Sequence, residues 1–257
     1  MMRIIILMIT CMCCMLSCSV KEDRTDCPCR MILDFSQVDT SKVKSLNILV
    51  TSDDGMVLNE VVSSEDFLSE YVRDVPHGRL RVNIWGGGEV RAHGGYGIVI
   101  PYGCECPPLY MDSFEGDAGG ESFRKVVNLH KNHCQLTVLI EGMETMPYSL
   151  TFSGNVDGYG LDGLPSAGDF SCVAYPGDDG GSQALLPRQL DSSLLLEIDD
   201  NSSTVKTFAV GEYIAGSGYD WSAENLDDIT IVLDYYVTYI KITIQGWDKE
   251  YSYDMIF

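Results

Sequence analysis

Apolar and polar residues alternate with a period of two along much of the chain. The clearest case is the stretch RLRVNI at positions 79–84, in which every second residue is apolar. Similar stretches recur at 31–35, 46–50, 136–140, 150–152, 194–198, 208–210, 229–233 and 240–244. Because successive side chains of a strand point to opposite faces, this period predicts strands with one buried face. Many short strands, separated by glycines and by Asp- and Asn-rich turns, indicate an all-β protein built from β-sandwiches.

Two kinds of segment interrupt this pattern. Ser63 and Asp66 stand at capping-box spacing, and the apolar residues up to Tyr71 share one helical face, which predicts one or two helical turns over 63–71. Three glycine-rich stretches are predicted to be loops, at 86–97, 104–120 and 157–181. With a boundary near Lys131 to Cys134, the predicted β-sandwich domains are residues 30–133 and 134–257.

The N-terminus has the pattern of an export signal. Arg3 precedes the uncharged apolar run from Ile4 to Met15, which is shorter than the roughly 20 residues needed to span a bilayer. Residues 1–17 are therefore predicted to be a signal peptide. The sequence Met15-Leu16-Ser17-Cys18 resembles a bacterial lipobox, which implies lipid attachment at Cys18 and a lipidated linker over 18–29. The alternative is an ordinary signal peptide followed by a chance cysteine.

Three charged residues follow Cys18 directly. Lys21, Glu22 and Asp23 resemble the basic-then-acidic export signal of Bacteroidetes surface lipoproteins. This resemblance implies that the protein is exposed on the outside of the outer membrane. The alternative is a solvated linker, since chain termini are usually polar.

The charge of the chain excludes two classes of partner. Its formal net charge is −21, with 17 Lys and Arg against 38 Asp and Glu. Nucleic acids are bound chiefly through Lys and Arg on phosphates, so we expect no nucleic-acid partner. The same charge disfavours docking on anionic lipid head groups, so attachment to a membrane depends on the lipid anchor.

Six of the ten cysteines follow Cys18, and four of them form Cys-x-Cys pairs. An even number in an exported chain favours disulfides. We expect at least one bridge between the pair Cys27 and Cys29 and the pair Cys104 and Cys106. A four-thiolate zinc site is the alternative, although such sites usually have Cys-x₂-Cys spacing. No metal site is predicted.

Several segments together resemble the FimB-type fimbrial anchor lipoproteins of Bacteroidales. They are the lipobox with its acidic spacer and Asp26-Cys27-Pro28, the stretch VPHGRLRVNIWGG from Val75, the stretch VVNLHKNHCQLTVLIEG from Val126, and a final hairpin with Trp247 after Gly246. The likeness runs over nearly the whole mature chain, although no single motif is highly specific. It implies two tandem transthyretin-like β-sandwich domains.

The resemblance also implies a function. Such proteins are anchors or minor subunits of a surface fimbria, with pilin subunits as partners through β-strand complementation. Structural pilins of this class lose an N-terminal strand by cleavage after an arginine, whereas an anchor should keep it because cleavage would release the lipid. Arg24 and Arg30 are predicted to precede the first strand, so cleavage stays open, and with it the choice between an anchor and a stalk or tip subunit.

The C-terminal tail YSYDMIF carries a second candidate for assembly. Tyr251, Tyr253, Met255 and Phe257 alternate and share one face of a strand. The tail is predicted to be the last strand of the second sandwich. The alternative is a strand offered to a partner, because a free apolar edge is otherwise prone to aggregation.

Catalytic chemistry is not expected, and neither is a cofactor or a small-molecule substrate. The chain lacks a Gly-x-Ser-x-Gly elbow, a phosphate loop and a dinucleotide fingerprint. The acidic glycine-rich stretch NVDGYGLDG from Asn155 is interpreted as a turn rather than a calcium loop, and the histidines, including His130 and His133, as surface residues. Trp221 is the one tryptophan considered for a ligand. A surface glycan-binding lipoprotein is the alternative function.

Overall fold

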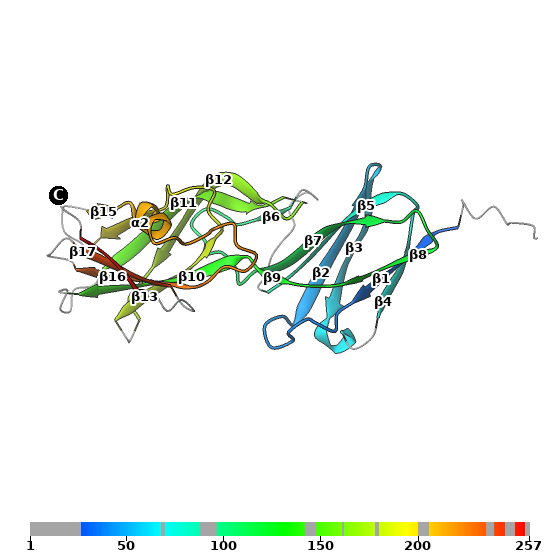
Figure 1. Ribbon diagram of the computed structural model, residues 1–257, viewed down its shortest axis with the longest axis horizontal. Coiled ribbons are helices and arrows are strands. Elements are labelled where there is room, and N and C mark those ends of the chain that lie inside the picture. Colours follow the sequence, from blue (N-terminus) through cyan, green and yellow to red (C-terminus); the bar gives the residue numbers. More distant parts are fainter. Residues whose placement is uncertain are drawn as a thin grey trace, which may run out of the picture.

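The computed structural model describes residues 27–67, 70–87, 97–141, 148–160, 162–177, 180–199, 206–234, 239–244 and 250–254, with side chains up to residue 233. The predicted signal peptide, Cys18 and the segment from Lys21 to Asp23 lie outside these residues. The described part is elongated, with the strands of the N-terminal half at one end and those of the C-terminal half at the other (Figure 1). No helix in the described part has the length and hydrophobicity of a membrane span.

The N-terminal half consists of two sheets. One has three strands in the order β4-β1-β8, and the other has five in the order β3-β2-β5-β7-β9. The strands are β1 (Cys29–Asp34), β2 (Ser45–Ser52), β3 (Gly55–Ser63), β4 (Tyr71–Val75), β5 (Arg79–Gly86), β7 (Tyr110–Asp117), β8 (Ser122–Val126) and β9 (His130–Lys131). Apolar side chains of both sheets form one buried cluster, which includes Met31, Leu33, Ile48 and Val82.

The C-terminal half also has two sheets, in the orders β13-β10-β16-β17-β18 and β12-β11-β14-β15. The strands are β10 (His133–Glu141), β11 (Ser149–Tyr159), β12 (Pro165–Ala174), β13 (Gly181–Pro187), β14 (Leu195–Asp199), β15 (Lys206–Phe208), β16 (Ile229–Asp234), β17 (Tyr239–Ile244) and β18 (Glu250–Asp254). A short strand of the N-terminal half of the sequence, β6 (Ile98–Val99), pairs with β11. A second buried cluster fills the space between these sheets.

The alternation in the sequence explains these strands. In β5, Leu80, Val82 and Ile84 are at most 1% exposed, while Arg79 and Arg81, which alternate with them, are exposed. Similarly, the inward residues Leu150 and Phe152 of β11 are fully buried. The prediction of an all-β protein is confirmed.

The helix and loop predictions need correction. Among the described residues of 63–71 there is one helical turn, the 3₁₀ turn η1 (Ser64–Asp66), but the Ser63 side chain makes no capping hydrogen bond. Tyr71 instead begins β4 and lies in the core. The α-helix found among the described residues, α2 (Val210–Gly216), was not predicted. Of the predicted glycine-rich loops, 104–120 contains β7, which pairs with β5 and β9, and 157–181 contains β12, which pairs with β11.

Candidate functional site

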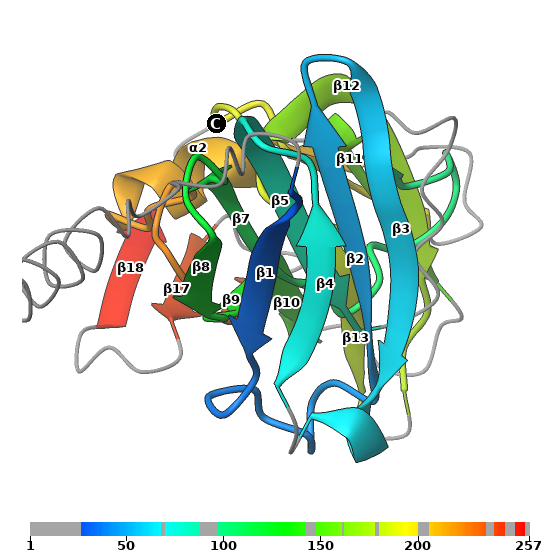
Figure 2. The ribbon, with the colours of Figure 1, turned by 90° about the vertical axis from the view of Figure 1, so that its right-hand side faces the viewer.

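The N-terminal strand occupies the centre of the three-stranded sheet. β1 pairs antiparallel with β4, from Cys29 opposite Val75 to Leu33 opposite Tyr71, and parallel with β8, from Arg30 opposite Ser122. Figure 2 shows β1 between these two strands. Its inward side chains Met31 and Leu33 are fully buried. The first described strand after the predicted lipidated linker is therefore an integral part of the core.

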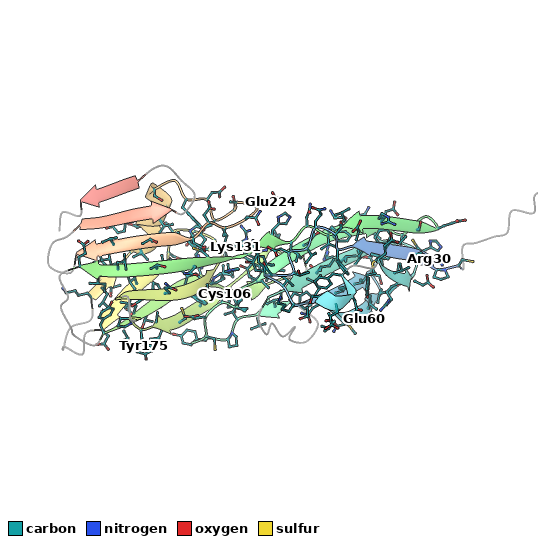
Figure 3. The ribbon with its side chains drawn as sticks, turned by 90° about the horizontal axis from the view of Figure 1, so that it is seen from below. Arg30, Glu60, Cys106, Lys131, Tyr175 and Glu224 are labelled. Atoms are coloured by element: carbon teal, nitrogen blue, oxygen red, sulfur yellow. The ribbon has the colours of Figure 1, made fainter. Side chains whose placement is uncertain are left out.

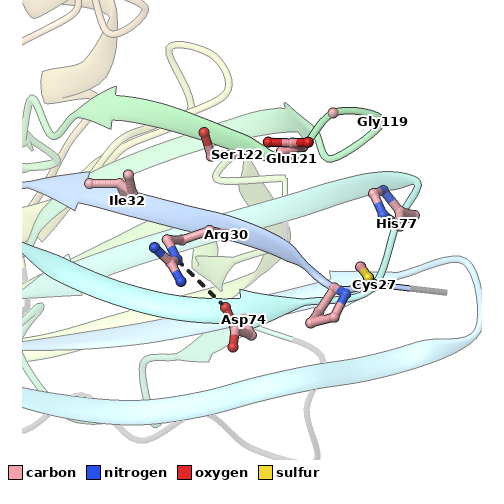
Figure 4. A pocket seen from close by; sticks show the side chains of 10 residues that line it. Cys27, Arg30, Ile32, Asp74, His77, Gly119, Glu121 and Ser122 are labelled. Carbon is pink, nitrogen blue, oxygen red and sulfur yellow. Dashed lines mark ion pairs between the residues drawn. The ribbon is translucent and has the colours of Figure 1, made fainter. Parts of the chain in front are cut away.

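A pocket of about 1130 Å³ lies where the chain enters β1. Figure 4 shows its wall, in which the Arg30 guanidinium and the Asp74 carboxylate are 3.9 Å apart. His77 Nδ1 lies 2.6 Å from the carbonyl of Ala118 on the same rim. Arg30 was predicted to precede the first strand, and this is wrong: it lies inside β1, with its backbone N–H bonded to the Glu121 carbonyl at 2.9 Å.

The expected bridge between the two Cys-x-Cys pairs is not formed, and all six described cysteines are free thiols. The reason is that the pairs belong to different halves. Cys29 is buried in the N-terminal core and Cys106 in the C-terminal core. Figure 3 shows Arg30, the neighbour of Cys29, far from Cys106. Spacing in the sequence could not reveal this separation.

Three of the cysteines share the C-terminal core. Cys106, Cys134 and Cys172 are all fully buried there. Burial raises the pKa of the Cys134 and Cys172 thiols to about 12 and raises that of Cys106 further. These groups stay protonated at neutral pH, so they are poor nucleophiles and poor metal ligands. Within the described residues no group of three His, Cys, Asp or Glu side chains is arranged to hold a metal ion.

The C-terminal tail forms an edge strand. β18 pairs antiparallel with β17, with Tyr251 opposite Ile242 and Tyr253 opposite Ile240. β17 in turn pairs with β16, whose Ile231 and Leu233 face the core, so both tyrosines lie in line with the buried rows of the sheet. Met255 and Phe257 lie outside the described residues. One side of β18 has no strand partner among the described strands, since β18 ends the order of its sheet.

The two halves are joined by more than the chain between them. The segment 97–109 follows β5 in the sequence, and its strand β6 pairs with β11. The backbone N–H of Cys106 in this segment donates a hydrogen bond to the Leu185 carbonyl of β13. The segment begins at Gly97, with φ +131°, where a Cβ atom would lie 2.1 Å from the Tyr159 carbonyl oxygen. Only glycine allows this close approach. The apolar residues Ile98, Ile100, Cys106 and Leu109 of this segment belong to the C-terminal core.

Arg188 holds a buried polar network at this junction. The residue is 8% exposed, and its guanidinium donates to the carbonyls of Trp221 at 2.8 Å, Ala223 at 2.5 Å and Glu224 at 2.9 Å. Its Nε–H donates to Asn132 Oδ1 at 2.7 Å. Burial lowers the pKa of Arg188, but the carbonyl oxygens supply the hydrogen bonds that a buried charge requires.

A second set of bonds at the junction centres on Asp228. Its Oδ1 accepts from Lys131 Nζ at 2.5 Å and from the Gln135 backbone N–H at 2.7 Å. The Lys131 backbone N–H also donates to Asn225 Oδ1, and its carbonyl accepts from the Leu226 N–H. The loop that contains Glu224 is thereby fixed against the end of the N-terminal half, as the positions of Glu224 and Lys131 in Figure 3 show.

These junction residues were not predicted from the sequence. The one available signal was Arg188 itself, a charged residue inside the apolar run from Ala184 to Leu190. His133 was predicted to be a surface residue, and this is wrong: it is 5% exposed, its ring lies edge-on to Tyr110 at 5.3 Å, and Nδ1 is 3.1 Å from the Leu109 carbonyl. Burial lowers its pKa.

The remaining candidates have structural partners. Asn155 Nδ2 donates to Asp191 Oδ1 at 2.6 Å, and Asp162 Oδ1 accepts from the Leu164 backbone N–H at 3.1 Å. The Asp162 contact is of the kind that stabilises turns, but Asn155 lies inside β11, so the first part of the stretch predicted to be a turn is a strand. Trp221 is half-buried, with its ring edge-on to Tyr219 at a centroid distance of 4.8 Å.

No protein-family model matches this sequence, and no curated protein matches it. Solved structures do match. A proposed polysaccharide-binding protein from Bacteroides thetaiotaomicron aligns over 89% of this chain and 98% of its own, with a TM-score of 0.64 and 12% identity. A proposed adhesin from Bacteroides ovatus aligns over 87% and 95%, with a TM-score of 0.59 and 14% identity. The fimbrial anchor protein Mfa2 from Porphyromonas gingivalis aligns over 86% and 98%, with a TM-score of 0.58 and 15% identity.

The chain has the fold of these proteins. The alignments cover nearly the whole length of each, so the likeness includes both halves and their connection. The same fold is shared by proteins described as polysaccharide-binding, adhesive and fimbrial. The fold alone therefore does not choose among these functions.

Proposed function

We propose that the chain is a surface lipoprotein that serves as the anchor or a minor subunit of a fimbria. In this proposal residues 1–17 are a signal peptide, Cys18 carries the lipid, Lys21 to Asp23 direct export, and 30–133 and 134–257 are the two domains. The protein lies on the outer membrane, acts without catalysis or a cofactor, and supports attachment and adhesion of the fibre.

The observation that carries the proposal is the position of β1. Two neighbouring strands hold it on both sides, and Met31 and Leu33 are buried beneath it. A tether at Cys18 would thus lead, eleven positions later at Cys29, into the central strand of a folded sheet. Cleavage after Arg30 would cut inside β1 and separate this strand from its tether, which favours an anchor that keeps its N-terminus.

The proposed contact with pilin subunits is the C-terminal edge. β18 leaves one of its sides without a strand partner among the described strands. An added strand from a pilin would gain main-chain hydrogen bonds there, while side-chain pockets would supply specificity. The fold shared with Mfa2, which is described as a fimbrial anchor protein, supports the same assignment.

The test is to purify the tagged protein from outer membranes of its own bacterium and look for a co-purifying polymer ladder. An anchor predicts that Cys18→Ala moves the ladder into the culture medium. Cys27→Ala, which changes an exposed free thiol near the start of β1, is the matched control and should leave the ladder on the cells. A ladder that stays on the cells with Cys18→Ala indicates a tip or accessory subunit.

A surface glycan-binding lipoprotein is the second candidate. It is favoured by the fold shared with the proposed polysaccharide-binding protein of Bacteroides thetaiotaomicron. If no ladder co-purifies from cells that visibly carry fimbriae, the fimbrial proposal is wrong. Slower migration of the protein in a gel that contains a soluble polysaccharide would then support the glycan-binding function.

A further inference from the structure

A groove of about 580 Å³ runs along the junction of the two halves, away from both β1 and β18. One wall is formed by the beginning of β7 and by β9. The other wall is formed by three loops of the C-terminal half. Two leucines on the wall are unusually exposed, Leu164 at 63% and Leu190 at 51%, and Trp221 lies on the same loop as the acidic residues Asp220 and Glu224. Exposed apolar side chains gathered in a groove are typical of a protein contact.

The charge of the groove is negative. Asp162, Asp220 and Glu224 line it, and all three are exposed. The pKa of Asp220 is lowered because its Oδ1 accepts from the Ser222 hydroxyl at 2.6 Å and the Ser222 backbone N–H at 2.8 Å, so it stays ionised. The Arg188 guanidinium in the same wall donates to three carbonyls and to Asn132, and is therefore not available to bind an anion.

The groove is also held open by fixed loops. Arg188 bonds to the backbone of the loop that carries Trp221 and Glu224. Asp162 closes the turn before Leu164 through the Leu164 N–H. Because these loops are already ordered by the fold, a ligand would not have to order them, which lowers the free-energy cost of binding.

We propose that this groove docks a segment of a partner protein in which a Lys or Arg stands beside a large apolar residue. The apolar residue would cover Leu164 and Leu190, and the cation would lie between the carboxylates and the Trp221 ring, where a cation–π contact adds to the attraction. An anionic ligand would be repelled. A neutral sugar fits less well, because the Trp221 Nε1–H is already buried and cannot donate to a hydroxyl.

The experiment uses the tagged full-length protein in its own bacterium, with a photo-reactive amino acid in place of Leu164. The same amino acid in place of Met56, which is 67% exposed on β3 in the other half, is the control. After irradiation the adduct is identified by mass spectrometry. We expect a protein adduct at position 164 at least fivefold above that at position 56, on a peptide that carries Lys or Arg beside an apolar residue.

Two further variants test the charge and the apolar contact. Glu224→Lys, at a side chain that is 75% exposed, and Leu190→Ser should each lower the adduct at position 164 at least threefold. Asp53→Lys changes the charge equally in the turn between β2 and β3 and should leave the adduct unchanged. A glycan adduct, a peptide without Lys or Arg, a yield no higher than at position 56, or an adduct insensitive to Glu224→Lys would overturn the proposal.

This proposal is independent of the fimbrial one. The polymer ladder described above is followed in the same Glu224→Lys and Leu190→Ser cells. Loss of the adduct with an intact ladder supports the groove and assigns it a partner other than the fibre. If no protein adduct forms at position 164 while the polymer ladder is intact in the parent cells, the groove proposal is wrong and the fimbrial function is unaffected.

Discussion

The two halves of the molecule build their cores in different ways. Among the described residues, the buried N-terminal core consists of residues between Cys29 and Val127, with Leu129 packed against it, and β1 is the central strand of its three-stranded sheet. The C-terminal core draws on residues from Leu49 to Leu233, including Trp85 and Met111 of the N-terminal sheets and the segment 97–109. The N-terminal half is thus complete in itself, whereas the C-terminal half depends on its neighbour.

This difference predicts a large effect when the halves are separated. A fragment of residues 133–257 lacks Ile98, Ile100, Cys106 and Leu109, so we expect it to have no cooperative thermal transition and a weak near-ultraviolet circular dichroism signal. The fragment 27–132 keeps its entire core and should melt cooperatively. A sharp transition in the fragment 133–257 would show that the segment 97–109 is not needed.

Single truncations in the full chain sharpen the comparison. Ile100→Ala and Leu33→Ala both remove a fully or nearly fully buried side chain, and each should lower the free energy of unfolding by about 2–5 kcal/mol. Hydrogen exchange separates them: Ile100→Ala should lose protection in β11 and β13, and Leu33→Ala in β4 and β8. Loss of protection in β2 and β5 on changing Ile100 would contradict the assignment of this residue to the C-terminal core.

The sequence patterns predicted structural features that depend on residues close together in the sequence. They missed features that depend on contacts between residues far apart in the sequence. The alternation over 79–84 correctly predicted β5 and the burial of its apolar residues, but Asn83, which the pattern places on the outward face, is only 2% exposed. The segment 97–109 overlaps the predicted loops 86–97 and 104–120 at its two ends, and its burial is decided by β11 and β13, more than fifty residues away in the case of Ile100 and Asp157. His133 was placed on the surface for the same reason, because a polar residue is buried only where a distant partner accepts its hydrogen bond.

The Arg188 network connects the two halves and offers an intermediate test. Arg188→Met would leave the part-buried carbonyls of Trp221, Ala223 and Glu224 without this donor, and an unmet buried group costs roughly 1–3 kcal/mol. We expect a loss of about 3 kcal/mol in the free energy of unfolding, together with faster proteolysis within 220–226. Arg188→Lys keeps the charge and should lose less. Equal losses of unfolding free energy for both variants would indicate that packing of the Arg188 aliphatic chain, rather than the hydrogen bonds of its guanidinium, stabilises the junction.

The junction should also respond to acid. Because burial lowers the pKa of His133, the folded state favours the neutral ring. Its contribution to stability is complete above the unfolded pKa of about 6.5 and is lost as the pH falls through and below that value. Urea denaturation from pH 7.5 to pH 5 should show this loss in the parent protein and a smaller one in His133→Gln. Identical pH profiles would remove His133 from the explanation.

The smallest effect is expected at the edge of the N-terminal half. Glu60 on β3 accepts from Arg73 at 2.6 Å and from the Tyr71 hydroxyl at 2.9 Å, but the Glu60 and Arg73 side chains are 32% and 43% exposed. Because solvent screens such pairs, Glu60→Gln should cost only about 0.2–1 kcal/mol in chemical denaturation. A loss as large as that of Leu33→Ala would mean that this edge, and not the buried cluster, determines the stability of the half.

The central place of β1 also has a mechanical consequence. A pull on the chain before Cys29, directed along the strand, acts on the hydrogen bonds to β4 and β8 at the same time, and these run over five residue pairs on each side. The bonds must then break together, in shear. A sideways pull on β18, which pairs with one neighbour among the described strands, breaks its five residue pairs one after another. The molecule therefore resists tension at its N-terminal end and yields at its C-terminal edge.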